Sequence, residues 1–456
     1  RGRIAQQDLY EVKRAGVDFN ELDVGYFVSE SDLAQYTEEE RVRYASGNKK
    51  GKLRMYAKGT FIYRLAGRER EKSASYYTPE VLTKCLVKYA LKELLKDKSA
   101  DDILHLTICA PAMGSAAFLN EAINQLAEAY ISRKAQETGE IIGYEERFNQ
   151  LQKVKMFIAD RNVHGGDLNP LAAELAEVSL WLNTIYPNGF VPWFGTQLVN
   201  GNSLIGARRQ CYRVSSLQAT SKGLRWYEKA PERVPLGTER KRGKLSTQIY
   251  HFLLGDPGMC SYTDKVIKQL EPAKIKFLNT WNKAFTAPYC DDDIETLKKL
   301  SKTIDKLWKD QISLRQQLKQ QTHDSLSVFK FNDDEPDSHT SIRTKDQMLR
   351  TMYRSENAKN AGAYARLKFA MDYWCALWFW PIDKADLLPS RSEFLNDMYM
   401  ILVGLYSTNS DSQQLSMLED ADEEDTDILL QVNLDELCAL LPRLRLARTI
   451  AQQNHF

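Results

Sequence analysis

The chain has 456 residues, and its 62 lysines and arginines nearly balance its 61 aspartates and glutamates. This length allows two or three domains with a sizeable core, and the balanced charge confines any nucleic-acid surface to a local basic patch. Seven cysteines without a C-x-x-C pair indicate reduced thiols and no zinc site, while the lack of a long apolar run or a signal peptide predicts a cytoplasmic chain without a membrane span.

Residues 1–70 form a polar segment of mixed charge, with a basic stretch at residues 49–54. We favour its interpretation as a solvated surface. The alternative is a contact with the DNA backbone, because lysines and arginines near Tyr56, Phe61 and Tyr63 would suit both phosphates and bases. The pattern of residues leaves both interpretations open.

A helix is predicted to begin at residue 79. Thr78 can act as its N-cap, Pro79 fits the first helical position, and Glu80 suits the positive end of the helix dipole. Apolar residues then recur at helical spacing as far as Leu94. An ordinary capped helix would show the same pattern, so this stretch alone indicates no function.

Residues 103–109 are predicted to form a strand, followed by Pro111, a turn of small residues at 112–117, and a helix from Phe118 to about residue 133. Such a strand–turn–helix unit opens a nucleotide-type site in doubly wound α/β folds. Gly114 and Ser115 would let a ligand approach the backbone, and the helix N-terminus would point free N–H groups into the same space. The alternative is a turn made only for packing.

Further strands are predicted at residues 163–167 and 197–200, and a helix at 144–160 precedes the first of them. An acidic residue that closes the second strand is placed to bind ribose hydroxyls in such a fold, and Asp167 stands there. Its alternative role is to cap the helix that Asn169 and Pro170 open. The apolar stripe of that helix comprises Leu171, Leu175, Val178, Leu182 and Ile185.

Residues 211–456 are predicted to be largely helical and to offer DNA contacts. Basic residues cluster around Gly243, one long helix or a packed pair is predicted for residues 291–324, and loops are predicted for residues 332–341 and 419–427. A final helix is predicted at 432–451. A helix at 361–380 has an aromatic face that we interpret as core, flanked by basic residues within reach of DNA: Arg354, Lys359, Arg366 and Lys368.

Four short motifs stand between about residues 75 and 210: S-Y-Y-T-P at 75–79, A-P-A-M-G-S-A-A-F at 110–118, V-H-G-G-D-L-N-P at 163–170 and G-N-S-L at 201–204. In this order and spacing they resemble the motifs of the DNA adenine-N6 methyltransferases. The best match is to the large restriction-type and phage-defence enzymes of BREX and DISARM systems. The resemblance divides the chain into an N-terminal segment (1–70), an S-adenosylmethionine-binding core (71–210) and an insertion (211–456).

The resemblance implies an α/β fold, namely a partial Rossmann-like class I methyltransferase sheet of the first three strands with a large, mainly α-helical insertion. It also implies S-adenosylmethionine as cofactor, double-stranded DNA as substrate, other defence-system subunits as partners, and direct methyl transfer to the adenine amino nitrogen. Asn202 would lie against the adenine ring of the cofactor, although an asparagine-containing turn is an alternative. The cofactor-binding residues that it assigns are Thr78, Pro111, Gly114, Ser115, Phe118, Asp167 and Asn202.

The chain departs from this family in three ways. It has no Asn-Pro-Pro-aromatic motif, and the passing likeness at residues 286–289 lacks the asparagine, so the sequence assigns no catalytic residue. Ala110 stands where the family has a carboxylate, and Ala116 stands where it has glycine. We therefore expect a fragment that ends before the catalytic strand, whose first strand lacks a neighbour on its inner side until other polypeptide supplies the remaining sheet.

Three functions remain open at this stage. The leading hypothesis is the cofactor-binding portion of an S-adenosylmethionine-dependent DNA adenine-N6 methyltransferase in a phage-defence or restriction–modification system. The second is a catalytically inactive subunit that keeps the fold and binds DNA or a protein partner, which Ala110 and the missing motif favour. The third is methylation of another amino group, in RNA or on a protein glutamine, because related folds share the missing motif.

Overall fold

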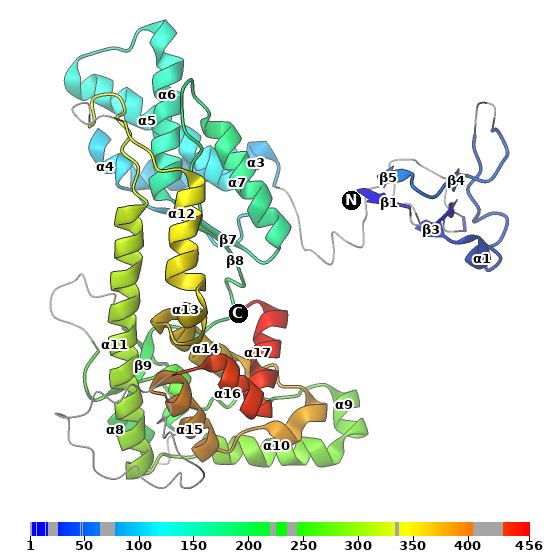
Figure 1. The fold of residues 1–456 in the computed structure, drawn as a ribbon, viewed down its shortest axis with the longest axis vertical. Helices are drawn as coiled ribbons and strands as arrows, with labels where there is room; N and C mark the ends of the chain where they lie inside the picture. The colour runs from blue at the N-terminus through cyan, green and yellow to red at the C-terminus, as the bar shows by residue number, and fades with distance from the viewer. Residues whose placement is uncertain are drawn as a thin grey trace. The chain divides into compact units, whose positions relative to one another are not determined.

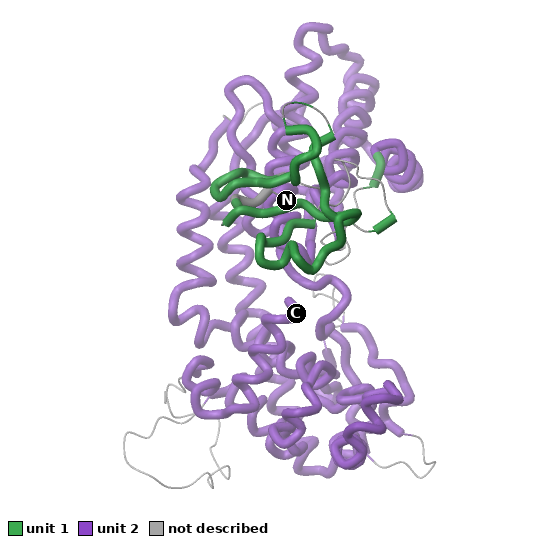
Figure 2. The backbone as a smooth tube through the Cα atoms, turned by 90° about the vertical axis from the view of Figure 1, so that its right-hand side faces the viewer, with its two compact units in different colours: residues 1–79 green, residues 80–456 purple. Residues whose placement is uncertain are grey.

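The computed structural model describes residues 2–5, 7–13, 15–16, 26–45, 47, 49–63, 78–218, 225–234, 244–332, 337–404 and 432–456. The chain divides into two compact units, Arg1–Pro79 (unit 1) and Glu80–Phe456 (unit 2) (Figure 2). Among the described residues, no helix has the length and apolar character needed to cross a membrane. The cluster around Gly243 and the acidic run at 419–427 lie outside the described residues, apart from Lys244.

Unit 1 is built from short antiparallel strands. β1 (Gly2–Ile4) pairs with β5 (Phe61–Tyr63). β2 (Leu9–Val12) lies between β3 (Tyr26–Val28) and β4 (Met55–Tyr56), and α1 (Glu30–Leu33) follows β3. The N-terminal polar segment is therefore a small β structure in its described part.

The basic stretch of unit 1 contains residues of two kinds. Nε of Arg54 lies 3.1 Å from Oε2 of the buried Glu11, so Arg54 is part of the internal structure. Lys49, Lys50 and Lys52 are exposed on a turn. Within residues 49–54, the three lysines are therefore the basic side chains available for a contact with the DNA backbone.

Unit 2 contains a parallel three-stranded sheet with the order β6-β7-β8. Figure 1 labels two of these strands, β7 and β8. The strands are β6 (Ile108–Ala110), β7 (Val163–Asp167) and β8 (Leu198–Asn200), and the helices around them are α3 (Glu80–Leu94), α4 (Ala100–Leu104), α5 (Ala117–Thr138), α6 (Tyr144–Asn162) and α7 (Pro170–Thr184). The prediction of a mixed α/β chain with three parallel strands is confirmed. The predicted start of the first strand was wrong, because Ser99 and Asp102 form a capping box that begins α4 instead.

One edge of this sheet is open. Within the described residues β6 pairs with β7 alone, and its other edge has no partner strand. Cys109, in the middle of β6, is exposed. A strand with unpaired N–H and C=O groups favours pairing with another polypeptide, so this edge is a place where further strands can add.

Helix α7 packs against the sheet through small residues rather than through its large apolar stripe. Ala172, Ala176 and Leu180 are buried, whereas the predicted stripe is exposed along its length, including Leu175 and Leu182. Small side chains let a helix approach closely, which leaves the larger ones outside. Helix α3 likewise leaves large apolar residues exposed, Leu82 and Leu86 among them, although its own buried face includes Val87 and Leu91.

The orientation of α7 predicts unequal effects for two leucine-to-alanine substitutions on this helix. Leu180→Ala is expected to lower the free energy of unfolding by about 2–5 kcal/mol, because Leu180 is 0% exposed and its loss leaves a cavity. Leu182→Ala, two residues along, is expected to cost less than about 0.5 kcal/mol because Leu182 is 59% exposed. Denaturant unfolding measures both, and a larger loss at Leu182 would contradict the observed packing.

The rest of unit 2, which we call the helical half (residues 206–456), has a second hydrophobic core. It is largely helical, as predicted, and it also includes a three-stranded antiparallel sheet. Its strands are β9 (Gln210–Arg213), β10 (Glu232–Arg233) and β11 (Gln248–Tyr250). Its helices are α8 (Val214–Leu217), η1 (Trp226–Glu228), η2 (His251–Leu253), α9 (Lys265–Leu270), α10 (Pro272–Phe285), α11 (Asp291–Gln321), α12 (Ile342–Leu349), η3 (Arg350–Arg354), α13 (Glu356–Asn360), α14 (Ala363–Ala376), η4 (Ile382–Leu387), α15 (Arg391–Leu402), α16 (Leu434–Leu440) and α17 (Pro442–Asn454).

Several predictions for the helical half can be compared with these elements. Residues 291–324 contain one continuous helix, α11, rather than a packed pair. The single final helix was wrong, because Pro442 has no N–H to continue α16 and begins α17 instead. The aromatic face of α14 is core as predicted at Phe369 and Tyr373, and Trp380 beyond the helix is also buried.

A buried ion pair joins α12 to the segment after α11. Nζ of Lys345 contacts Oδ2 of Asp324, and both side chains are almost fully buried. Burial raises the pKa of the nearby Asp160 to about 6, with a smaller contribution from the negative charge of Asp324 and an opposing one from Lys345. Asp160 is therefore a carboxylate whose ionisation opposes folding.

The raised pKa of Asp160 predicts a pH-dependent effect of Asp160→Asn. The folded state holds this proton up to about pH 6 while the unfolded chain releases it near pH 4, so wild-type stability falls as the pH rises between these values. The amide does not titrate. In denaturant unfolding, the free energy of unfolding of the variant relative to that of wild type should rise by on the order of 2 kcal/mol between pH 4 and pH 7. A pH-independent difference would contradict the assignment.

Candidate functional site

The loop between β6 and α5 is held in an unusual backbone conformation. Gly114 has φ +55°, and a Cβ added there would meet nothing within 4 Å, so open space lies above this residue. Ala116 has φ +67° and is fully buried. An alanine in this left-handed region is strained by about 1–2 kcal/mol, and glycine would avoid this strain. The cost of alanine at position 116 is therefore larger than that of fitting one added methyl group.

Met113 fixes the base of this loop. Its backbone N–H donates to the carbonyl of Gly166 at 3.0 Å, and its side chain is buried. A Cβ on Gly165 would lie 2.4 Å from Sδ of Met113, so glycine at 165 makes room for that side chain. Sequence reasoning did not assign either residue, although the paired glycines in β7 were the available signal.

Asp167 joins the loops that follow all three strands. Its Oδ2 accepts the N–H of Gly114 at 2.9 Å, and its Oδ1 accepts the N–H of Asn169 at 2.9 Å. Its backbone carbonyl accepts the N–H of Gly201 at 3.0 Å and Nδ2 of Asn200 at 2.9 Å. The side chain of Asn169, not that of Asp167, caps α7, so Asp167 does not fill the alternative role of helix cap.

Asn202 forms the asparagine-containing turn that was its alternative interpretation. Its Oδ1 accepts the N–H groups of Leu204 at 3.0 Å and Ile205 at 3.1 Å. Its backbone N–H donates to the carbonyl of His455 at 2.8 Å, which places the end of the chain beside the loop after β8 (Figure 1). Nδ2 of Asn202 makes no hydrogen bond to the described residues, so this amide group remains available.

The other residues assigned from the resemblance have varied surroundings. Ser115 is partly buried in the loop, Pro111 is exposed, and Phe118 packs against the core of the sheet. Thr78 belongs to unit 1, whereas the other residues assigned from the resemblance belong to unit 2. Ala110 pairs with Gly165 at the end of β6, so a carboxylate there would stand beside the loop.

The site brings together three features that favour ligand binding. The open loop, the N-terminus of the long helix α5 and the carboxylate of Asp167 all meet at the carboxyl edge of a parallel sheet. Among the described residues, no cluster of histidine, cysteine, aspartate or glutamate could hold a metal ion. Tyr289, in the discounted motif, is buried in the second core and accepts the N–H of Gly255 at 3.1 Å.

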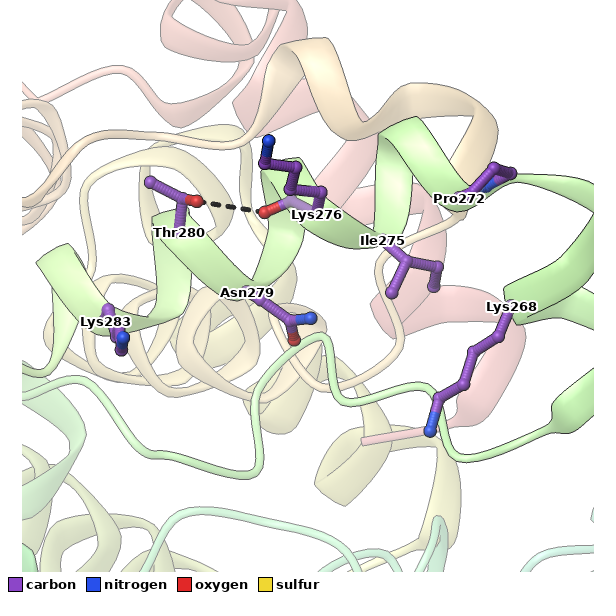
Figure 3. A pocket seen from close by; sticks show the side chains of 7 residues that line it. All are labelled: Lys268, Pro272, Ile275, Lys276, Asn279, Thr280 and Lys283. Atoms are coloured by element: carbon purple, nitrogen blue, oxygen red, sulfur yellow. Dashed lines mark hydrogen bonds between the residues drawn. The ribbon is translucent and has the colours of Figure 1, made fainter.

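A basic groove of about 460 Å³ lies on α9 and α10, apart from these loops (Figure 3). The lysines that line it are Lys268, Lys276 and Lys283, and no acidic residue lines it. The hydroxyl of Thr280 donates to the carbonyl of Lys276 at 3.0 Å, so this hydroxyl is already hydrogen-bonded within α10. Such a lining favours a phosphate-bearing partner.

Two of the basic residues that were expected within reach of DNA are used internally. The guanidinium of Arg366 donates to the carbonyls of Ile401 and Leu402. Lys368 donates to Asp372 at 2.6 Å and to the carbonyl of Phe456 at 2.9 Å. These contacts indicate structural roles, whereas Arg354 and Lys359 are exposed.

No family model matches the chain, and no curated protein matches it.

Proposed function

We propose that this chain is the cofactor-binding portion of an S-adenosylmethionine-dependent DNA adenine-N6 methyltransferase of a phage-defence or restriction–modification system. The observation that carries the proposal is the hydrogen bond from Gly114 to Asp167, because it joins two of the resembling motifs at one edge of a parallel sheet. Ligands bind at this edge in open α/β sheets. The three strands then represent the first part of a Rossmann-like sheet.

The residues present fit such a cofactor. A carboxylate has about four lone-pair positions, so Asp167 can hold Gly114 and Asn169 and still accept hydrogen bonds from ribose hydroxyls. The space above Gly114 lets the amino-acid end approach the backbone, and the free Nδ2 of Asn202 can donate to the adenine ring. When bound, S-adenosylmethionine supplies an activated methyl group.

The catalytic motif and the remaining strands belong, in this proposal, to polypeptide outside residues 1–456. The open edge of β6 supports this view, because a central strand of a larger sheet would be paired on both sides. The lysine-lined groove on α9 and α10 supports double-stranded DNA as the partner, since lysines neutralise phosphates without reading sequence.

The second candidate function is an inactive subunit that keeps the fold. It is favoured by Ala110, which leaves the glycine loop without a carboxylate at the end of β6. Calorimetric titration with S-adenosylmethionine, using wild type and Ala110→Asp, separates the two. We expect wild type to bind the cofactor and Ala110→Asp to bind it about tenfold more tightly. The gain corresponds to one added charge-assisted hydrogen bond.

Other results of this titration have distinct meanings. Binding by Ala110→Asp alone would mark position 110 as the lesion of a disabled enzyme. No binding by either folded protein would contradict the cofactor site and favour the inactive subunit.

A further inference from the structure

A second cavity, of about 250 Å³, lies in the helical half and contains none of the residues assigned to the cofactor site. It is bounded by β9, η1, η2 and α14. Sites for drug-sized ligands have volumes of roughly 300–1,000 Å³, so this cavity suits a smaller molecule such as a single ring system.

Two indole rings line the cavity and are held in place by hydrogen bonds. Nε1 of Trp226 donates to the carbonyl of Thr286 at 2.9 Å, and Nε1 of Trp374 donates to the carbonyl of Leu254 at 2.8 Å. The ring of Tyr212, also in the lining, meets Trp226 edge-on at 5.2 Å. Fixed aromatic walls favour a planar ligand, because little side-chain freedom is lost when it binds.

Two polar side chains of the cavity, Asp256 and Gln210, have atoms that make no hydrogen bond to the described residues. Oδ1 of Asp256 accepts the N–H of Gly258 at 2.8 Å, and no described residue donates to its Oδ2. The side-chain amide of Gln210 makes no hydrogen bond to the described residues. Both side chains line the cavity. A carboxylate and a primary amide are the groups that recognise the edges of nucleobases.

His251 and Arg208 complete the lining. Nε2 of His251 lies 2.9 Å from both the backbone nitrogen and the carbonyl oxygen of Arg208. Burial lowers the pKa of His251 to about 4, so its ring is uncharged at neutral pH. Arg208 is exposed and can meet a phosphate outside the cavity.

We propose that this cavity binds a nucleobase with an exocyclic amino group, which adenine, cytosine and guanine carry and thymine lacks, by stacking on Trp226 or Trp374 and donating its amino protons to Asp256. The base belongs either to a free nucleotide or to a nucleotide unstacked from nucleic acid. A lipid chain would leave the polar groups unpaired, and inorganic phosphate alone would be repelled by Asp256. The inference does not depend on the proposed cofactor site.

The test uses the tryptophans as a built-in probe. Deoxyadenosine and deoxycytidine monophosphates are expected to change tryptophan fluorescence and to release heat on titration, and thymidine monophosphate to bind about tenfold more weakly because it lacks the amino group. Asp256→Asn should remove this preference, since an amide also donates to the thymine carbonyl. Glu228→Gln, an exposed carboxylate on η1 outside the lining, is the matched control and should change nothing.

Three results would overturn the inference. They are no binding of any monophosphate, full competition by inorganic phosphate, or loss of deoxyadenosine monophosphate binding in Asp167→Ala, which would place the ligand in the cofactor site. A short single-stranded oligodeoxynucleotide distinguishes the sources. Stronger competition by the oligonucleotide than by the monophosphate supports an unstacked base, and weaker competition supports a free nucleotide.

Discussion

Replacing Asp167 with alanine is expected to abolish measurable binding of S-adenosylmethionine. The substitution removes the acceptors that hold the N–H groups of Gly114 and Asn169, and it removes the carboxylate proposed to bind the ribose hydroxyls. Hydrogen bonds to a charged group contribute about 1.5–3 kcal/mol each, so the loss of two bonds to the ribose hydroxyls lowers the affinity by a factor of about 100 or more. Calorimetric titration measures this directly.

Asn169→Ala is the matched control for the Asp167 substitution. It removes the side chain that caps α7 and is expected to cost about 0.5–2 kcal/mol of stability, yet it leaves the carboxylate of Asp167 in place. Cofactor affinity should then change by less than about threefold, a difference below 1 kcal/mol. Equal loss of affinity in both variants would mean that helix α7, rather than the carboxylate, determines binding.

The parallel sheet was predictable because local signals mark its strands. β6 ends directly before Pro111 and β8 ends directly before Gly201, while β7 ends two residues before Asn169, and these signals act within a few residues. The packing of α7 was not predictable in the same way. Periodicity identifies a stripe of large apolar residues, but the small face at Ala172 and Ala176 packs more closely on the sheet.

The candidate site shows the same limit of sequence reasoning. Asp167 was assigned from its place at the end of a strand, but its hydrogen bond to Gly114 spans 53 residues of sequence and depends on the register of β6 against β7. The contact between Asn202 and His455 joins even more distant residues. No local pattern encodes such pairs, because they arise from how the elements pack.

Asp397→Ala is expected to destabilise the helical half by about 3–5 kcal/mol. Asp397 lies on α15 and is fully buried. It accepts the hydroxyl of Tyr373 on α14 at 2.8 Å and both Nε and Nη2 of Arg443 on α17, at 2.7 and 2.9 Å. Removing it leaves a guanidinium and a phenol without their shared acceptor. Denaturant unfolding measures the loss.

Asp435→Asn provides the comparison at an exposed ion pair. Its partner is Arg448 at 2.5 Å, but the Asp435 side chain is 65% exposed, so the loss should stay below about 1 kcal/mol. Replacing Asp397 and Arg443 together, with leucine and methionine, should recover part of the stability, since Arg443 then no longer lacks its buried partner, while the hydroxyl of Tyr373 still lacks an acceptor. Helix α17 ends beside His455, whose backbone carbonyl accepts the N–H of Asn202. Destabilising α17 should therefore also weaken this hydrogen bond to the loop after β8. Undiminished stability in Asp397→Ala would contradict this role of the buried pair.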